Sequence, residues 1–144
     1  MPEMSSTPLI ALTWFALWTL ILMGNVARWR VGQVLAGKAK SDSFPAGIKH
    51  GSDAEWRANR AHANAIENLV VFAALVLTGV AAGITAGTFA TLCLVVAIAR
   101  PVQSIIHLAS GSGQATNLRF AAFLVQFVCF IWMAVLLLMH FYGM

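Results

Sequence analysis

Four long apolar stretches, separated by polar or glycine-containing segments, constrain the fold of this chain most strongly. A membrane-spanning helix needs about 17–25 predominantly apolar residues, because the hydrocarbon core of a bilayer is about 30 Å thick. Inside lipid, the backbone groups of a single span must be hydrogen-bonded within that span, which favours helices. The sequence therefore predicts an all-α, integral membrane four-helix bundle in a single domain, with spans at about residues 9–26, 62–80, 88–108 and 119–141.

The composition agrees with this prediction, since 60% of the residues are hydrophobic and only 10% are charged. Soluble domains average about 45–50% apolar and about 25% charged residues. The formal net charge of +4 does not indicate a nucleic-acid partner, because the basic residues gather at the predicted membrane edges. Cys93 and Cys129 lie inside apolar stretches and are predicted to be unpaired core residues, without metal-ligand spacing.

The connections between the spans predict the topology. Four spans place both termini on one side of the membrane. The long polar connection, residues 28–62, contains seven of the nine Lys and Arg residues, so the positive-inside rule places it on the cytoplasmic side together with residues 109–117. Residues 41–47 and 110–117 are predicted to be irregular. Because no basic segment precedes the first stretch, we expect a retained transmembrane helix there rather than a cleaved signal peptide.

The second helix begins as a polar segment at about Trp56 and becomes apolar without a helix breaker. Arg60, Asn64, Glu67 and Asn68 lie at i, i+4, i+7 and i+8, which places them on one helical face. A carboxylate inside a hydrophobic span is costly unless a partner or a ligand meets it. The spacing therefore predicts that this face holds something polar.

Polar residues of the third and fourth helices occur at a similar predicted depth. Arg100, Gln103 and His107 share a face at i, i+3 and i+7, and Arg119 begins the last span. Two interpretations remain open. Glu67 can form an ion pair with Arg100 or Arg60 that only fastens helices together, or the surplus of arginines binds a small anion with carboxylates through bidentate contacts.

Residues 60–67 (RAHANAIE), followed by an apolar span with Phe72, resemble the signature helix of the MAPEG family, the membrane-associated proteins in eicosanoid and glutathione metabolism. The resemblance extends to Arg100 seven residues before His107, to Arg119, and to four spans over essentially the whole chain. The chain looks like a bacterial-type member. The resemblance implies a homotrimer in the bacterial inner membrane, with glutathione as co-substrate between neighbouring protomers near the cytoplasmic face.

The resemblance also implies the roles of individual residues. Glutathione would be bound by Arg60, Asn64, Glu67, Asn68, Arg100, Gln103 and His107. Among these, Arg60 and Arg100 would hold carboxylates, Asn64 the peptide, and Glu67 the γ-glutamyl ammonium. Family members often have tyrosines where this chain has Asn68, Gln103 and His107, and the segment between His107 and Arg119 is longer than in the eukaryotic enzymes.

Catalysis would depend on arginine residues. Arg119 would stabilise the glutathione thiolate, because an adjacent guanidinium lowers the pKa of a thiol from about 8.5. Arg28 or Arg30 would act on the lipophilic substrate. These roles predict a membrane glutathione transferase, or a glutathione-dependent peroxidase, acting on lipophilic electrophiles. The alternative is a non-catalytic membrane protein that binds glutathione or an anionic lipid in the same polar cluster. A small transporter is disfavoured, because the chain has no inverted repeat.

Overall fold

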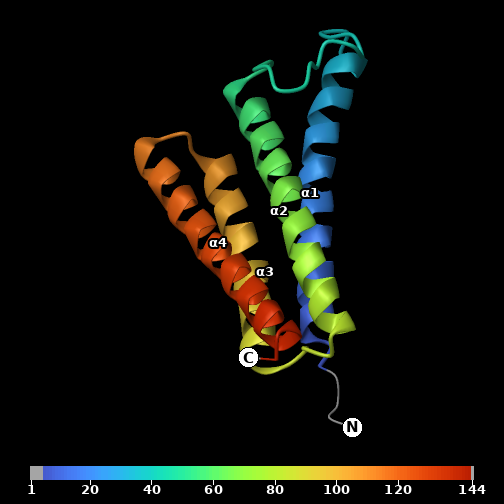
Figure 1. Ribbon diagram of the computed structural model, residues 1–144. Coiled ribbons are helices and arrows are strands. Elements are labelled where there is room, and N and C mark those ends of the chain that lie inside the picture. Colours follow the sequence, from blue (N-terminus) through green and yellow to red (C-terminus); the bar gives the residue numbers. More distant parts are fainter. Residues whose placement is uncertain (1–4, 144) are drawn as a thin grey trace.

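The computed structural model describes residues 5–143, and this part of the chain folds into four helices without a strand (Figure 1). The helices are α1 (Thr7–Leu35), α2 (Asp53–Ala81), α3 (Gly87–Ala109) and α4 (Gly113–Phe141). They contain 23 to 29 residues each, long enough to cross the hydrocarbon core at about 1.5 Å per residue. Residues 1–4 of the N-terminal segment lie outside the described residues.

Large apolar side chains cover the outer surface of the bundle. Ile10, Val70, Ile98 and Phe120, one from each helix, are all at least 60% exposed in the isolated protomer. All four helices are long and apolar enough to span a membrane. A surface of this kind suits lipid, whereas soluble monomers rarely expose such large apolar areas. The prediction of an all-α integral membrane four-helix bundle is therefore confirmed.

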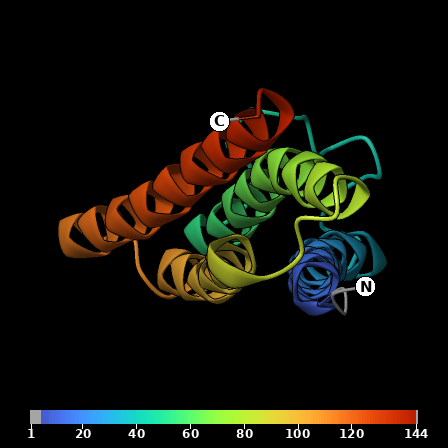
Figure 2. The same cartoon turned by 60° about the horizontal axis from the view of Figure 1, so that its bottom comes forward.

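The helices form two hairpins, α1–α2 and α3–α4, with α2 and α3 lying between α1 and α4 (Figure 2). Both termini and the α2–α3 connection lie at one end of the bundle, as the four-span topology predicts, and the α1–α2 and α3–α4 connections lie at the other (Figure 1). We call this second end the loop end. The two hairpins diverge towards the loop end, so polar residues near the start of α2, the end of α3 and the start of α4 can face one another there.

Aromatic packing and one close backbone approach hold the helices together. The Phe72 ring of α2 lies 5.4 Å from the Phe15 ring of α1 and 6.1 Å from the Phe130 ring of α4, measured between ring centroids. Gly79 of α2 faces Phe89 of α3 so closely that a methyl group on Gly79 would overlap the ring. The predicted state of the cysteines is confirmed, because Cys93 and Cys129 are both buried and unpaired.

The first helix is longer than expected from the apolar pattern. Helix α1 continues past Val26 to Leu35, so Arg28 and Arg30 are helical and the irregular connection begins only at residue 36. Charged residues do not end a helix when no breaker follows. The helix ends where Gly37 adopts a φ of 68°, a conformation that favours glycine at helix C-termini.

Two serine caps define the helix starts at the loop end. The Ser52 hydroxyl accepts a hydrogen bond from the Glu55 N–H (3.3 Å), and the Glu55 carboxylate accepts one from the Ser52 N–H (2.6 Å), which forms a capping box for α2. Ser112 caps α4 by accepting from the Ala115 N–H (3.2 Å). Helix α4 thus begins at Gly113, and most of the 110–117 segment expected to be irregular is helical.

Candidate functional site

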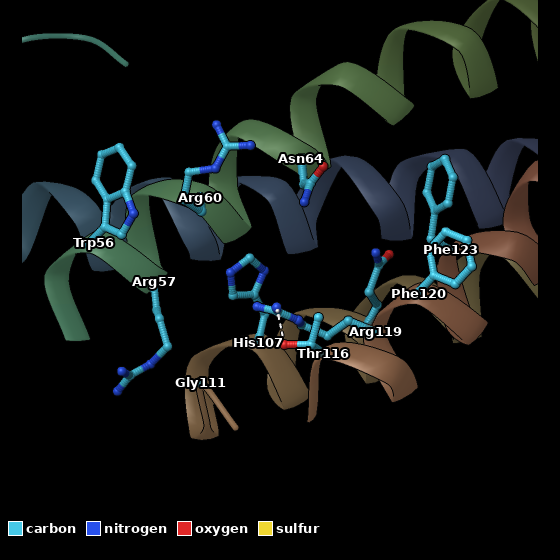
Figure 3. Close-up of a pocket in the computed structure, with 11 residues that line it drawn as sticks. Trp56, Arg57, Arg60, Asn64, His107, Gly111, Thr116, Arg119, Phe120 and Phe123 are labelled. Carbon is cyan, nitrogen blue, oxygen red and sulfur yellow. Dashed lines mark hydrogen bonds between the residues drawn. The ribbon is translucent and has the colours of Figure 1, made fainter. Parts of the chain in front are cut away.

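A pocket of about 560 Å³, lined by basic, amide and aromatic side chains, lies at the loop end between α2 on one side and α3 and α4 on the other (Figure 3). Its volume lies within the range of about 300–1,000 Å³ that is typical of small-molecule sites. We call it the arginine pocket and define it by its lining residues: Trp56, Arg57, Arg60, Asn64, Gln103, His107, Gly111, Thr116, Arg119, Phe120 and Phe123.

The α2 wall of the arginine pocket follows from helical periodicity. Trp56, Arg60 and Asn64 are spaced four residues apart, and Arg57 lies beside them. The capping box at the start of α2 fixes this first part of the helix, and the Arg57 Nε donates a hydrogen bond to the Leu108 carbonyl of α3 (3.2 Å). This bond joins the two hairpins beside the pocket.

The opposite wall comes from the end of α3 and the start of α4. Arg119 Nη2 donates to Thr116 Oγ1 (3.0 Å), which holds the guanidinium against the first turns of α4 (Figure 3). On α3, the Gln103 Oε1 accepts a hydrogen bond from Gln126 Nε2 of α4 (2.9 Å), and His107 lies one turn further along. Phe120 and Phe123 give one part of this wall an aromatic surface.

The ionisable side chains that line the arginine pocket are all basic. Three arginines and a histidine line it, and none of the residues between 5 and 143 that line it has a carboxylate side chain. The nearby acidic residues lie outside the pocket. Asp53 pairs with Lys49 (2.6 Å) and is also attracted by the Arg57 guanidinium, and Glu55 serves the capping box and accepts from Gln33 Nε2 (3.1 Å). Guanidinium groups bind carboxylates and phosphates in bidentate geometry. The arrangement is therefore suited to an anion with more than one acidic group.

The structure brings together five of the ten site residues expected from the sequence. These five line the arginine pocket: Arg60, Asn64, Gln103, His107 and Arg119. Two others belong to α2 but lie outside it. Asn68 is buried and its Nδ2 donates to the Asn64 carbonyl (2.7 Å), whereas the Glu67 side chain is exposed on the surface of the protomer.

Arg100 also lies outside the arginine pocket. It is only 1% exposed, and its guanidinium carbon lies 5.2 Å from the centre of the Phe15 ring of α1. Its Nε and Nη2 have no hydrogen-bond partner within residues 5–143. The only ion pair in this part of the chain joins Lys49 and Asp53, so Glu67 pairs with neither Arg100 nor Arg60 inside the protomer.

Arg28 and Arg30 lie on α1, which does not line the arginine pocket. Arg28 Nη2 donates to Asn25 Oδ1 (3.0 Å) on the same helix. Arg30 Nη2 donates to Asn59 Oδ1 of α2 (2.9 Å), and its guanidinium lies 5.6 Å from the centre of the Phe44 ring. Within one protomer, both arginines therefore face hollows other than the arginine pocket.

Sequence reasoning missed several pocket residues, among them Arg57, Thr116 and Phe123. Their spacing from predicted site residues places them on the same helical faces. Arg57 precedes Arg60 by three residues, and Thr116 and Phe123 lie three residues before and four after Arg119. Thr116 lies in the 110–117 segment expected to be irregular, Arg57 lies before the apolar part of α2, and Phe123 has the apolar character of a lipid-facing residue. No cluster of three or more His, Cys, Asp or Glu within residues 5–143 could hold a metal ion.

The fold and the arginine pocket together define an integral membrane protein of four helices that presents a cationic site at one end of the bundle. The MAPEG family model matches residues 8–139, which is nearly the whole chain, and the chain belongs to that family. The resemblance found in the signature helix is thereby confirmed. No curated protein and no solved structure gives a significant match.

Proposed function

We propose that this protein is a membrane glutathione transferase that joins glutathione, through its thiolate, to lipophilic electrophiles. The observation that carries the proposal is the arginine pocket, where three guanidinium groups, an imidazole and two amides face a space of about 560 Å³ without any carboxylate. Glutathione with an ionised thiol has three anionic groups, two carboxylates and the thiolate. Membership of the MAPEG family supports glutathione as the ligand of this pocket.

In the proposed complex, Arg60 binds one carboxylate of glutathione and Asn64 hydrogen-bonds its peptide. Gln103 and His107 offer further hydrogen bonds from the opposite wall, in the positions where relatives often have tyrosines. The bond from Gln126 to Gln103 supports this role, because it orients the Gln103 amide before a ligand arrives. The contacts of Asn68, Arg28, Arg30 and Glu67 with ligand remain predictions from the family resemblance. The contact that the resemblance assigns to Arg100 is left out of the proposed complex, because Arg100 does not line the arginine pocket within one protomer.

The chemistry depends on Arg119. A guanidinium beside the sulfur favours the thiolate and lowers the pKa of the glutathione thiol, so more nucleophile is present at neutral pH. The thiol proton leaves to water. The sulfur electron pair then forms a bond to an electrophilic carbon, and the leaving group departs with its bonding electrons. In a peroxidase reaction the thiolate would instead attack the terminal oxygen of a lipid hydroperoxide, which breaks the O–O bond and releases the lipid alcohol after protonation. A second glutathione would then react with the resulting sulfenic acid to give glutathione disulfide and water. Phe120 and Phe123 supply an apolar wall for such substrates.

The exposure of Glu67 supports assembly of the proposed homotrimer. A carboxylate that faces lipid is costly, so a neighbouring protomer or the γ-glutamyl ammonium of glutathione would have to cover it. We place the loop end on the cytoplasmic side of a bacterial inner membrane, because the basic residues of the α1–α2 connection gather there. The electrophile would then enter the pocket from the bilayer.

The test measures glutathione binding and thiolate absorbance in the purified protein, with conjugation to chlorodinitrobenzene as the activity. The Arg119→Ala variant should lose the thiolate signal and at least about tenfold of the activity, the effect of about one pKa unit. The Lys40→Ala variant removes an exposed charge at the same end and should behave like the wild type. The proposal fails if the wild type does not bind glutathione, or if Arg119→Ala leaves the thiolate signal unchanged.

One observation favours the alternative of a non-catalytic protein that binds an anionic lipid. Leu118 and Phe120, which flank Arg119, are 57% and 60% exposed, so the arginine pocket borders the apolar outer surface. A lipid headgroup could therefore reach Arg119 from the bilayer. Native mass spectrometry distinguishes the two functions, since retained anionic lipid without any thiolate signal on addition of glutathione would support the alternative.

A further inference from the structure

We propose that His107 is the catalytic base of the arginine pocket and accepts the thiol proton of glutathione before that proton reaches water. This inference rests on the proposed function and adds a proton-transfer step to it. The family resemblance gives this position a ligand contact, which a tyrosine makes in many relatives. An imidazole in its place can also take up a proton near neutral pH.

The position of His107 brings its ring to the place where the sulfur is proposed to bind. His107 lies one turn beyond Gln103 on the pocket-lining face of α3, and its side chain is half-buried. Figure 3 shows the ring extending into the space between Arg60 of α2 and Arg119 of α4. A thiol that reaches the Arg119 guanidinium is therefore bound beside the imidazole as well.

The imidazole of His107 is free to bond to a ligand. Side-chain hydrogen bonds within residues 5–143 hold Arg57, Gln103, Thr116 and Arg119, and none of these bonds involves His107. A neutral imidazole has one N–H donor and one unprotonated nitrogen. The unprotonated nitrogen can accept a hydrogen bond from the thiol, which is the contact that a base needs before it takes the proton.

The other side chains that line the pocket in one protomer do not take up a proton at neutral pH. The arginines stay protonated, and the amides of Asn64 and Gln103, the Thr116 hydroxyl and the aromatic side chains are not bases in this range. Among the described lining residues, His107 is the one side chain that can act as the base.

The charges around His107 make its proton uptake depend on the ligand. The guanidinium groups of Arg57 and Arg60 on α2 and of Arg119 on α4 act on the ring, and no acidic side chain between residues 5 and 143 lines the pocket. Like charges disfavour the imidazolium, so the ring stays neutral before glutathione binds and is available as a base. The anionic groups of glutathione oppose this repulsion. Binding of the ligand therefore favours transfer of the proton to His107.

In the proposed step, the S–H bond of glutathione breaks and an N–H bond forms on the unprotonated ring nitrogen of His107. The sulfur keeps the electron pair and becomes the thiolate beside Arg119, while the imidazole becomes an imidazolium. The thiolate then attacks the electrophile. The imidazolium releases its proton to water, which restores the neutral base for the next turnover.

The experiment measures the rate constant of thiolate formation by stopped-flow absorbance, after saturating glutathione is mixed with the full-length protein in nanodiscs. His107→Gln keeps a hydrogen-bonding amide but cannot take up the proton. It should form the thiolate about 100-fold more slowly, the lower end of the usual contribution of general acid–base catalysis. Its dissociation constant for S-methylglutathione, which has no thiol, should stay within about threefold of the wild type. His140→Gln removes an exposed histidine at the other end of the bundle and should match the wild type.

A second variant tests proton uptake directly. In His107→Ala, added imidazole should restore fast thiolate formation in proportion to the concentration of its unprotonated form. Sodium chloride at the same ionic strength should not. A residue that only positions the helix or the ligand gives no such rescue, because free imidazole replaces a base and not a structural contact.

The inference is wrong if a His107→Gln variant, shown to be folded by size-exclusion chromatography, forms the thiolate at the wild-type rate. It is equally wrong if the rate and the affinity for S-methylglutathione fall by the same factor, because His107 then only binds the ligand. In both cases the proposed function stands. If the wild type shows no thiolate signal with glutathione, the proposed function fails and the inference fails with it.

Discussion

Arg100 of α3 places its guanidinium carbon 5.2 Å from the centre of the Phe15 ring of α1, and both side chains are almost completely buried. The ring face attracts the cation, with a strength of about 2 kcal/mol when both groups are desolvated. This attraction does not replace hydrogen bonds, because Nε and Nη2 of Arg100 have no partner within residues 5–143. The pair therefore joins α1 to α3 at a net cost in desolvation.

We predict that Arg100→Met keeps the fold and does not lower stability, because replacing a poorly satisfied buried charge with an apolar side chain of similar length is often neutral or stabilising by about 1–4 kcal/mol. Glutathione affinity should change by less than about threefold, about 0.65 kcal/mol, since Arg100 does not line the arginine pocket. Thermal unfolding in detergent and calorimetry measure the two quantities. A folded Arg100→Met variant with tenfold weaker binding would show instead that Arg100 reaches the ligand.

The placement of Arg100 illustrates what the sequence could and could not predict. Periodicity correctly grouped Gln103 with His107, because residues four apart lie on one helical face. It could not predict which neighbouring helix that face meets at each turn. One turn away from the loop end, the same side of α3 meets α1 rather than the open space between the hairpins, so Arg100 packs on Phe15.

The positions of the four membrane spans were predictable from the lengths of the apolar stretches. Apolar length determines where a chain can cross a bilayer, and the four helices contain the predicted spans. Polar helical extensions carry no such signal. The helical part of α1 beyond Val26 contains Arg28 and Arg30, which line hollows other than the arginine pocket, and Ser112 starts α4 early enough to bring Thr116 beside Arg119. These details depend on capping and on helix rotation rather than on hydropathy.

The pH dependence of bound glutathione tests the role of Arg119. A guanidinium stabilises the thiolate and not the thiol, so the pKa of bound glutathione should lie below about 8.5 and the thiolate absorbance should persist as pH falls through that value. Arg119→Ala should move the midpoint back up by about one unit, equivalent to about 1.4 kcal/mol, whereas Arg119→Lys should keep part of the shift. Spectrophotometric titration of the bound ligand measures it. A midpoint that is the same in all three proteins would remove Arg119 from the mechanism.

The bond between Gln126 and Gln103 should support both the fold and the pocket. Gln126→Leu removes the donor to the Gln103 carbonyl oxygen (2.9 Å), and interhelical hydrogen bonds in membranes contribute about 0.6–1.7 kcal/mol. We expect a loss of stability in that range and a several-fold weaker binding of glutathione, because Gln103 is no longer oriented. Gln114→Leu, at an exposed position on α4, is the matched control and should have little effect.

A double-mutant cycle with Gln103→Leu separates this coupling from general damage to the helix interface. If the two glutamines interact as the structure indicates, the double variant should be less destabilised than the sum of the single variants, because neither side chain is then left with an unmet group. Strict additivity of the free energies of unfolding would contradict the predicted coupling.

The close approach of α2 and α3 at Gly79 predicts an asymmetry between two glycine substitutions. Gly79→Ala places a methyl group against the Phe89 ring and should destabilise the protein by about 1–3 kcal/mol, the usual cost of overpacking. Gly24→Ala on α1 meets no atom within 4 Å and should be neutral or stabilising by about 0.5–1 kcal/mol, the gain of alanine over glycine in a helix. Unfolding in detergent with increasing dodecyl sulfate measures both effects. Adding Phe89→Leu to Gly79→Ala should recover stability by making room for the methyl group, and a double variant no more stable than Gly79→Ala alone would mean that α2 and α3 do not meet at these residues.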